Sequence, residues 1–374
     1  MRRPVAPGGT VVVKVGSSSL TGPTGGIDEA SIAGVVSHVV ALVAEGYKPL
    51  LVTSGAIAAG LPALGRTVRP TDIADLQVAA AVGQSRLMER YAAGFGASGL
   101  TVGQVLLTKD VLGNRQQYLN ARSALTRMVE LGVIPIVNEN DTVVVDEVRV
   151  GDNDQLAAIT SHLVRADMLI ILTDTPGLYA DDPRLMEDAQ LLSAVKHTDE
   201  VLDRIRSSAA KGSLGSGGVA TKVAAARMAA FSGIPTVVAQ SRVPDVVALA
   251  VEGADVGTWV DPRPESLPAR KLWIAFGLPS CGVLTVDDGA VLALGKGGRS
   301  LLGVGVTDVE GSFERSDAVE VKDDHGALVA KGVVRVGSEE LRSGIGQHSS
   351  QIGGEVIHRD DLVVFGSPNP AGSG

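Results

Sequence analysis

Short apolar runs rich in valine and isoleucine alternate with longer alanine-rich stretches over residues 1–262. The short runs have the length and composition of strands, and the longer stretches those of helices. The predicted strands span Thr10–Val15, Pro49–Thr53, Val102–Leu107, Val133–Val137, Met168–Thr173 and Thr236–Ala239. The predicted helices span Asp28–Glu45, Asp72–Ala93, Arg115–Leu131, Asn153–Arg165 and Gly218–Ser232. This alternation indicates an α/β fold with a doubly wound, mostly parallel sheet, in which ligands bind at the carboxyl ends of the strands.

The pattern changes at a proline-punctuated stretch that begins at Asp261-Pro262. Strand-like runs separated by Asp-Gly and Gly-Gly turn signals follow, at Gly282–Val286, Ala318–Val321 and Leu328–Val336, with one predicted helix at Asp287–Leu294. The sequence therefore predicts a first domain over 1–262, a linker over 263–279, a small β-rich domain over 280–366 and a disordered tail over 367–374.

Composition narrows the class of protein. A chain of 374 residues with 45% hydrophobic and 20% charged residues is typical of a globular protein with two domains. A net charge of -9 argues against a main role in gripping nucleic acid or an anionic membrane, and favours small-molecule partners. The single cysteine, Cys281, excludes a disulfide framework and a thiolate zinc site. No run reaches the roughly 18 apolar residues that cross a bilayer, so we expect a cytoplasmic protein with no membrane association.

Two polar clusters, Asn138–Asp141 and Gly151–Asp154, flank a β-branched run at Thr142–Val150. Asparagine and aspartate favour turns, which would explain one cluster without any ligand. A hairpin over the β-branched run would bring both clusters to the same end of the sheet. We favour this second interpretation, in which amide and carboxylate groups converge on a small polar ligand.

Lys14 lies inside the apolar first strand and is followed by Gly16 and three serines. A buried lysine is costly unless an anion pairs with it. An edge-strand lysine that prevents aggregation is the alternative. The glycine and serine turn favours a phosphate site, because its backbone N–H groups would face phosphate oxygens.

A second glycine-rich turn runs from Gly215 to Lys222 and leads into a predicted helix. Glycines allow close backbone approach, and a helix N-terminus attracts anions. Lys222 opposes the helix dipole there, so its position costs stability unless an anion binds nearby. A flexible loop capped by Ser216 or Thr221 is the alternative.

The sequence contains no Walker A motif and neither the His-Arg-Asp nor the Asp-Phe-Gly triplet of protein kinases. A phosphate-handling enzyme would therefore belong to another lineage. In such an enzyme Lys14 and Lys222 would neutralise charge on the transferring and leaving phosphates, and Asp154 would hold both lysines.

Thr53–Gly60 follows the second strand and opens a helix. It is not a Gly-x-Ser-x-Gly nucleophile elbow, so an acyl-transfer serine is disfavoured. Ser54 and the Gly55 backbone are better suited to binding a substrate carboxylate. Thr173-Asp174 follows the fifth strand and borders a turn, which is a weak indication of a nucleotide site.

Taken together and in order, six motifs resemble the glutamate 5-kinase family, which combines an amino-acid-kinase domain with a small PUA domain. The resemblance covers nearly the whole chain. The motifs are Val-Lys-Val-Gly-Ser-Ser-Ser from Val13, Thr-Ser-Gly-Ala-Ile-Ala-Ala-Gly from Thr53, Val-Asn-Glu-Asn-Asp-Thr-Val from Val137, Val-Gly-Asp-Asn-Asp from Val150, Leu-Thr-Asp-x-x-Gly-Leu-Tyr from Leu172 and Gly-Ser-Gly-Gly-Val-Ala-Thr-Lys from Gly215. Gly346–Gln351 and Val356–Asp361 are similar to the closing motifs of the family.

The resemblance implies ATP-dependent phosphorylation of the side-chain carboxylate of L-glutamate, the first step of proline biosynthesis, with Mg²⁺ accompanying the nucleotide and no metal held by the protein alone. It implies that Lys14, Lys222 and Asp154 act in catalysis and that Ser54, Asp141 and Asn153 bind glutamate. The implied ATP site consists of Lys14, Thr173, Asp174, Ser216, Gly217, Gly218, Val219, Ala220, Thr221 and Lys222.

The family also implies feedback inhibition by proline and assembly into dimers or tetramers. Arg149 and Ser216 replace residues that are commonly lysine and threonine in the family. Arg149 keeps the charge but changes its geometry, and Ser216 keeps the hydroxyl group. Two alternatives stay open. The substrate could be acetylglutamate or aspartate, or the PUA-like domain could bind RNA, which its excess of acidic residues disfavours as a main role.

Overall fold

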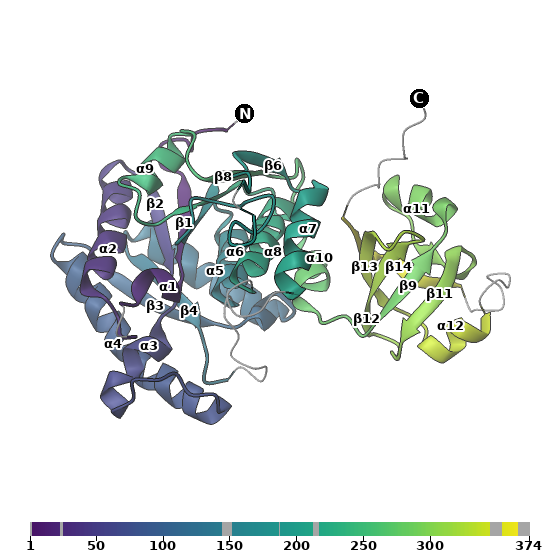
Figure 1. Cartoon of the computed structure of the whole chain (residues 1–374), viewed down its shortest axis with the longest axis horizontal. Coiled ribbons are helices and arrows are strands. Elements are labelled where there is room, and N and C mark those ends of the chain that lie inside the picture. The colour runs from purple at the N-terminus through teal and green to yellow at the C-terminus, as the bar shows by residue number, and fades with distance from the viewer. Residues whose placement is uncertain are drawn as a thin grey trace. The chain divides into compact units, whose positions relative to one another are not determined.

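The computed structural model describes residues 2–22, 25–143, 152–186, 188–211, 217–344 and 354–365. The chain divides into two compact units, residues 1–266 and residues 267–374 (Figure 1). The predicted hairpin at Thr142–Val150 lies almost wholly outside the described residues, as do Ser216, the motif at Gly346–Gln351 and the predicted tail. No described helix is long and apolar enough to cross a membrane.

The first unit is built on an eight-stranded sheet with the strand order β3-β4-β2-β1-β5-β7-β8-β6. Every neighbouring pair is parallel except β7 and β8, so the predicted doubly wound, mostly parallel fold is confirmed. The strands are β1 (Thr10–Val15), β2 (Lys48–Val52), β3 (Val102–Leu107), β4 (Ile134–Glu139), β5 (Met168–Thr173), β6 (Ala194–Lys196), β7 (Thr236–Gln240) and β8 (Thr258–Asp261). Strands β6 and β8 do not correspond to any predicted strand.

Helices cover both faces of this sheet (Figure 1). They are α1 (Ser17–Leu20), α2 (Glu29–Ala44), α3 (Ala56–Gly60), α4 (Ile73–Gly96), α5 (Arg115–Glu130), α6 (Asp152–Val164), α7 (Glu200–Lys211), α8 (Gly217–Phe231) and α9 (Val246–Val251). Three of the long helices begin where a side chain caps them. Asp28, Asp72 and Asn114 each accept a hydrogen bond from a backbone N–H in the first turn of α2, α4 and α5.

Strand β1 occupies the centre of the sheet, and its two faces differ. Val11, Val13 and Val15 share one aliphatic core with buried residues of α2, α4 and α9. Because side chains alternate along a strand, Val12 and Lys14 face the opposite layer, which contains α6 and α8. The chain continues from β1 to β2 on one side, whereas β5 pairs with β1 on the other. The carboxyl end of β1 is therefore a topological switch point, where ligands of such sheets bind.

Helices α3 and α4 make an unusually close contact beside this end of the sheet. A Cβ atom placed on Gly83 of α4 would lie 1.7 Å from the carbonyl oxygen of Ala56, and one on Gly60 would lie 2.0 Å from that of Ala79. No side chain fits in this contact, so glycine is required at both positions.

The second unit contains a six-stranded sheet with the order β10-β14-β13-β12-β9-β11. Its strands are β9 (Gly282–Val286), β10 (Leu301–Leu302), β11 (Val306–Gly311), β12 (Ala318–Asp323), β13 (Leu328–Val334) and β14 (Glu355–Val364), and its helices are α11 (Asp288–Gly295) and α12 (Ser338–Gly344). A core of buried hydrophobic residues from these strands and helices supports the unit. Strands β9, β12 and β13 and helix α11 correspond to predicted elements.

The stretch predicted as a linker contains regular structure. Helix α10 (Ala269–Leu272) and a π-helical turn at Trp273–Gly277 lie within it and belong to the second unit. Arg270 forms an ion pair with Asp361 of β14 at 2.6 Å. Lys271 donates to the carbonyl oxygen of Arg359 at 3.0 Å. These contacts attach α10 to the β-rich sheet.

Candidate active site

The carboxylate of Asp154 contacts two lysines at the carboxyl end of β1. Lys14 Nζ lies 2.5 Å from Asp154 Oδ1, and Lys222 Nζ lies 3.6 Å from Asp154 Oδ2. Thr221 Oγ1 donates a hydrogen bond to Oδ2 at 2.8 Å. Lys14 comes from β1, Asp154 from the first turn of α6, and Thr221 and Lys222 from the first two turns of α8. The structure thus brings together the three residues for which a catalytic role was predicted.

This lysine cluster, Lys14, Asp154 and Lys222, is largely buried, and with both lysines protonated it has a formal charge of +1. The side chains of Lys14 and Asp154 are 3% and 0% exposed, and that of Lys222 is 16% exposed. Burial lowers the pKa of Lys14 against the attraction of Asp154, and the nearby Lys222 lowers it further. Burial acts to raise the pKa of Asp154, but the two ammonium groups and the Thr221 hydroxyl hold that pKa below its ordinary value. An anion bound beside the two lysines would offset the surplus charge.

The N-terminus of α8 adds to this preference for an anion. Gly217 and Gly218 begin the helix, and Val219, Ala220 and Thr221 follow in its first turns. The backbone N–H groups of a helix start are free to bind, and the dipole is positive there. Lys222 Nζ also donates to the carbonyl oxygen of Gly218 at 3.1 Å, which holds the ammonium group near the helix start. The glycine backbone and the positive dipole end of α8 therefore lie beside the Lys222 ammonium group, as expected for a phosphate site.

Two of the predicted glutamate-binding residues lie next to the lysine cluster. Asn153 Nδ2 donates to Ser54 Oγ at 3.0 Å. Asn153 directly precedes Asp154 on α6, so this pair and the cluster are adjacent. Ser54 sits in the turn from β2 to α3, where Gly55 has a φ of +99° that a side chain would strain. The third predicted residue, Asp141, lies in the turn after β4 and is partly buried.

Thr173 and Asp174 lie at the end of β5, the strand that pairs with β1. In this register Val15 stands beside Leu172, so Thr173 lies one residue further along at the same sheet edge. Thr173 Oγ1 donates to Asp174 Oδ1 at 3.0 Å, and Gln240 Nε2 donates to the Asp174 carbonyl oxygen at 3.1 Å. Thr173 and Asp174 therefore lie on the side of β1 opposite to Ser54.

Sequence reasoning missed two residues near the site. Tyr91 of α4 is buried, and its hydroxyl group lies 2.8 Å from Thr53 Oγ1. Burial raises the pKa of Tyr91. Gln84 of α4 is only 8% exposed and accepts a hydrogen bond from Asn138 Nδ2 at 2.7 Å. The sequence contained a signal for Gln84, because this polar residue lies at helical spacing from Leu76, Ala80 and Leu87 on the buried face of α4.

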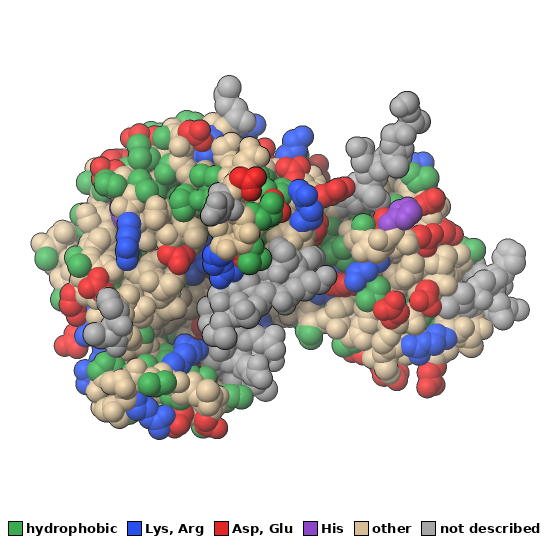
Figure 2. All heavy atoms as spheres, viewed as in Figure 1, with side chains coloured by type: hydrophobic (Ala, Val, Ile, Leu, Met, Phe, Trp, Pro, Cys, Tyr) green, Lys and Arg blue, Asp and Glu red, His purple; other side chains and the backbone are tan. Residues whose placement is uncertain are grey.

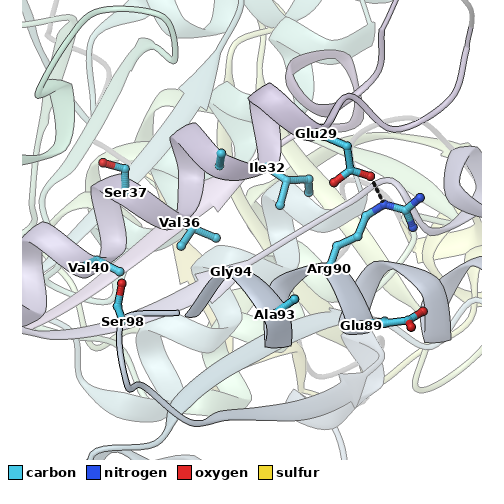
Figure 3. A pocket seen from close by; sticks show the side chains of 11 residues that line it. Glu29, Ile32, Val36, Ser37, Val40, Glu89, Arg90, Ala93, Gly94 and Ser98 are labelled. Carbon is cyan, nitrogen blue, oxygen red and sulfur yellow. Dashed lines mark hydrogen bonds and ion pairs between the residues drawn. The ribbon is translucent and has the colours of Figure 1, made fainter. Parts of the chain in front are cut away.

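A groove of about 650 Å³ lies between α2 and α4 and takes no part in this arrangement (Figure 3). Ile32, Val36 and Val40 form its apolar wall, and an ion pair between Arg90 and Glu29 at 2.6 Å lies at one end. None of the predicted site residues lines it. Helices α2 and α4 pack on the face of β1 opposite to Lys14, which separates the groove from the lysine cluster.

Comparison with known proteins identifies the family of the chain. The model of the amino acid kinase family matches residues 9–240, a range that contains every residue of the predicted site. The chain belongs to the amino acid kinase family. The model of the PUA domain matches residues 282–355, within the second unit, so this family member carries the β-rich domain that its motifs had indicated.

Curated relatives within the amino acid kinase family match nearly the full length. The glutamate 5-kinase of Marinomonas sp. (strain MWYL1) is 48% identical over 373 residues, which cover 98% of this chain and 100% of the relative. The glutamate 5-kinase of Chromohalobacter salexigens is 46% identical, covering 95% of each chain. That of Geobacter metallireducens is 44% identical, covering 95% of this chain and 97% of the relative. The resemblance to glutamate 5-kinases is therefore confirmed.

Proposed function

We propose that this chain catalyses ATP-dependent phosphorylation of the side-chain carboxylate of L-glutamate, giving L-glutamyl 5-phosphate and ADP. The observation that carries this proposal is the buried lysine cluster with one surplus positive charge, adjacent to the Ser54–Asn153 pair. The nearly full-length similarity to glutamate 5-kinases supports the choice of substrate. We further propose that the reaction is the first step of proline biosynthesis in the cytoplasm.

In this proposal ATP and glutamate approach the cluster from opposite sides. Ser54, Asp141 and Asn153 hold the amino acid. The γ-phosphate of ATP lies against Lys14 and Lys222, which neutralise charge on the transferring group. The rest of the nucleotide site comprises Thr173, Asp174 and the segment from Ser216 to Lys222.

The chemistry requires no general base, because a side-chain carboxylate is already ionised at neutral pH. Asp154 is therefore not needed as a base, and its proposed role is to hold the two lysine side chains in position. Its two oxygens are engaged by Lys14, Lys222 and Thr221, and these contacts fix the two ammonium groups on either side of one carboxylate. The carboxylate oxygen of glutamate attacks the γ-phosphorus directly, ADP leaves, and no covalent protein intermediate forms.

Mg²⁺ fits this site as a partner of the nucleotide. Among the described residues, no group of three histidine, cysteine, aspartate or glutamate side chains is arranged to hold a metal ion. Mg²⁺ commonly binds through substrate phosphates and keeps several waters, with few protein ligands. We therefore expect the ion to arrive with ATP and to neutralise charge on the phosphate oxygens.

The test is ADP release with ATP and Mg²⁺ across L-glutamate, N-acetylglutamate, L-aspartate and carbamate, with hydroxylamine present to trap an acyl phosphate as hydroxamate. We expect hydroxamate from glutamate alone, and we expect Lys222→Ala to abolish it. Turnover on a different acid would support phosphoryl transfer to a carboxylate but refute glutamate as the substrate. No turnover on any acid would refute the proposal.

Regulation and assembly form a finer part of the proposal. By the resemblance to glutamate 5-kinases, we expect proline to inhibit by binding at or near the glutamate site, and we expect the chain to form dimers or tetramers. Addition of proline to the hydroxamate assay and light scattering of the purified chain test these two expectations. Inhibition that excess glutamate does not relieve would contradict a shared or neighbouring site.

RNA binding by the second unit is a secondary expectation that its PUA match suggests. Figure 2 shows acidic and basic side chains interspersed over the visible face of this unit. A face on which acidic and basic side chains are mixed supplies little of the phosphate-contact energy that drives RNA affinity. We therefore propose RNA binding only as a side activity, which a salt-dependent mobility shift of labelled RNA with the full chain would detect.

A further inference from the structure

Gln84 has a buried donor group that no described residue accepts. Its Oε1 accepts a hydrogen bond from Asn138 Nδ2 at 2.7 Å, whereas its Nε2 is shielded from solvent and makes no hydrogen bond. A buried N–H group without a partner costs about 1–3 kcal/mol, and such groups are rare in folded proteins. A bound molecule that accepts this hydrogen bond would remove the cost.

The direction of the hydrogen bonds around Gln84 is set by one backbone group. The N–H of Glu139 can only donate, and it donates to Asn138 Oδ1 at 2.9 Å and to Asn153 Oδ1 at 3.2 Å. Each of these two amides must therefore turn its NH₂ group away from Glu139. Asn138 donates to Gln84, and Asn153 donates to Ser54 at 3.0 Å.

Both ends of this network present donors. Ser54 Oγ accepts from Asn153, which leaves the hydroxyl hydrogen of Ser54 for another acceptor. Gln84 Oε1 accepts from Asn138, which leaves the Nε2 hydrogens. A carboxylate offers only acceptors and forms stronger hydrogen bonds than a neutral group does. The polarity of the network therefore fits an anionic ligand better than an ammonium group.

The network extends from the lysine cluster toward α4. Asn153 adjoins Asp154, whereas Gln84 lies at the far end of the chain of bonds. Gly83 presses against Ala56, so the backbone beside Gln84 contacts the segment that begins at Ser54. A substrate with one carboxylate at the lysine cluster would place its second carboxylate toward the Gln84 end.

We propose that Gln84 Nε2 donates a hydrogen bond to the α-carboxylate of the amino-acid acceptor, which makes Gln84 a specificity-determining residue. This inference rests on the proposed function, because it takes the side-chain carboxylate of the same substrate to be the one that faces the lysines. Gln84 recognises the part of the substrate that does not react.

The experiment uses the full chain with Gln84→Met, which keeps the length of the side chain but has no donor, and Gln84→Glu, which keeps the shape but adds a charge. The hydroxamate assay gives KM separately for glutamate and for ATP. We expect KM for glutamate to rise about 10-fold or more in Gln84→Met and further in Gln84→Glu, with KM for ATP changed less than about 2-fold. Gln116→Met is the matched control, because Gln116 is exposed on α5 and bonds only Asn120 among the described residues.

Two analogues of glutamate, each tested for competition with glutamate, separate contact with the α-carboxylate from a general disturbance of the site. Glutarate keeps both carboxylates of glutamate, whereas 4-aminobutyrate lacks the α-carboxylate. We expect Gln84→Met to weaken inhibition by glutarate as much as it raises KM for glutamate, and to leave inhibition by 4-aminobutyrate unchanged.

The outcomes distinguish this inference from the proposed function. A wild-type chain that does not phosphorylate glutamate would refute the proposed function. If the wild-type chain phosphorylates glutamate, two results would refute the role of Gln84 alone. Either the Gln84 variants leave KM for glutamate unchanged, or they raise KM for glutamate and KM for ATP together. Thermal unfolding of each variant confirms that the comparison is made on folded protein, and Gln84→Glu decides if Gln84→Met fails to fold.

Discussion

Asp154 determines whether the two lysines can stay where phosphoryl transfer needs them. Its carboxylate is fully buried and meets Lys14, Lys222 and Thr221. Sequence reasoning found Lys14 because a lysine in an apolar strand is conspicuous, and the structure shows how burial is tolerated. Gln84 was missed because a glutamine in a helix contrasts less with its neighbours than a lysine in an apolar strand does. Its position on the apolar face of α4 was the available sequence signal, and its contact with Asn138 shows where the side chain lies.

Replacement of Asp154 by asparagine should both inactivate and destabilise the chain. It leaves Lys14 buried without a counter-charge, a change that typically costs about 3–5 kcal/mol. Urea unfolding followed by circular dichroism measures this loss. Asp75→Asn is the control, because the Arg66–Asp75 pair is 44% and 45% exposed and should contribute less than about 1 kcal/mol. A loss as small as that of the control would show that Lys14 does not depend on Asp154.

His162 of α6 should make stability depend on pH. Burial, together with Arg122 and Arg165, lowers its pKa from 6.5 to about 4. Below pH 6.5 His162 becomes protonated in the unfolded chain, whereas in the folded chain it stays neutral down to about pH 4. Stability should therefore fall as the pH falls through this window, by up to about 3 kcal/mol.

Unfolding experiments across this pH range test the expectation on the wild type and on His162→Gln. The variant keeps a side-chain amide near the Tyr118 hydroxyl group, which lies 3.3 Å from His162 Nε2, but it cannot be protonated. Its stability should fall less over the same window. Identical slopes for the two proteins would assign the pH dependence to other groups.

At the scale of elements, the sequence predicted those strands and helices whose position is set by a local pattern of residues. Strands β1, β3 and β5 were found with their observed ends, because each is an apolar run bounded by turn residues. Strands β6 and β8 were missed, since three and four residues are too few to show a period. The order of the strands, and with it the meeting of β1, α6 and α8, depends on contacts between distant segments that no local pattern encodes.

The contact of α3 with α4 is an element-scale feature that a single methyl group should disrupt. In Gly83→Ala the new Cβ would lie 1.7 Å from the Ala56 carbonyl oxygen, so the two helices must separate. We expect destabilisation of about 1–3 kcal/mol and a higher KM for glutamate, because Ser54 precedes α3.

Gly34→Ala is the matched control for this variant. Gly34 lies within α2, and a Cβ there would meet nothing within 4 Å. Alanine is a better helix former than glycine, so this variant should gain up to about 1 kcal/mol. Chemical unfolding and the hydroxamate assay give both quantities, and a Gly83→Ala variant as stable as the wild type would show that the close contact is not required.

At the scale of the whole molecule, the first unit holds every residue of the candidate site. It has an aliphatic core of its own, and so does the second unit. The two kinds of sheet were foreseeable from the change of pattern near Asp261. The division after Ser266 was not, because helix α10 occupies a stretch whose prolines indicated a linker.

Truncation after Ser266 should leave a folded kinase. It removes α10 together with the strand β14 that α10 contacts, so no part of the second unit is left behind. We expect hydroxamate formation from glutamate to persist, while inhibition by proline or assembly changes. Circular dichroism, activity and light scattering of the truncated chain provide the measurements. A folded but inactive truncation would show that catalysis requires the second unit.

The central position of β1 also bears on how the chain is made. One neighbour of β1, β2, begins at Lys48, but the other, β5, begins only at Met168. A nascent chain that ends before β5 therefore exposes an apolar strand edge with Lys14 lacking its carboxylate partner. Such edges invite pairing with other chains. Helix α6 and strand β5 are neighbours in the sequence, so they emerge from the ribosome at nearly the same time. Strand β5 then covers the exposed edge of β1, and Asp154 of α6 neutralises Lys14. Protection from aggregation and the first step in assembling the site therefore depend on the same part of the chain.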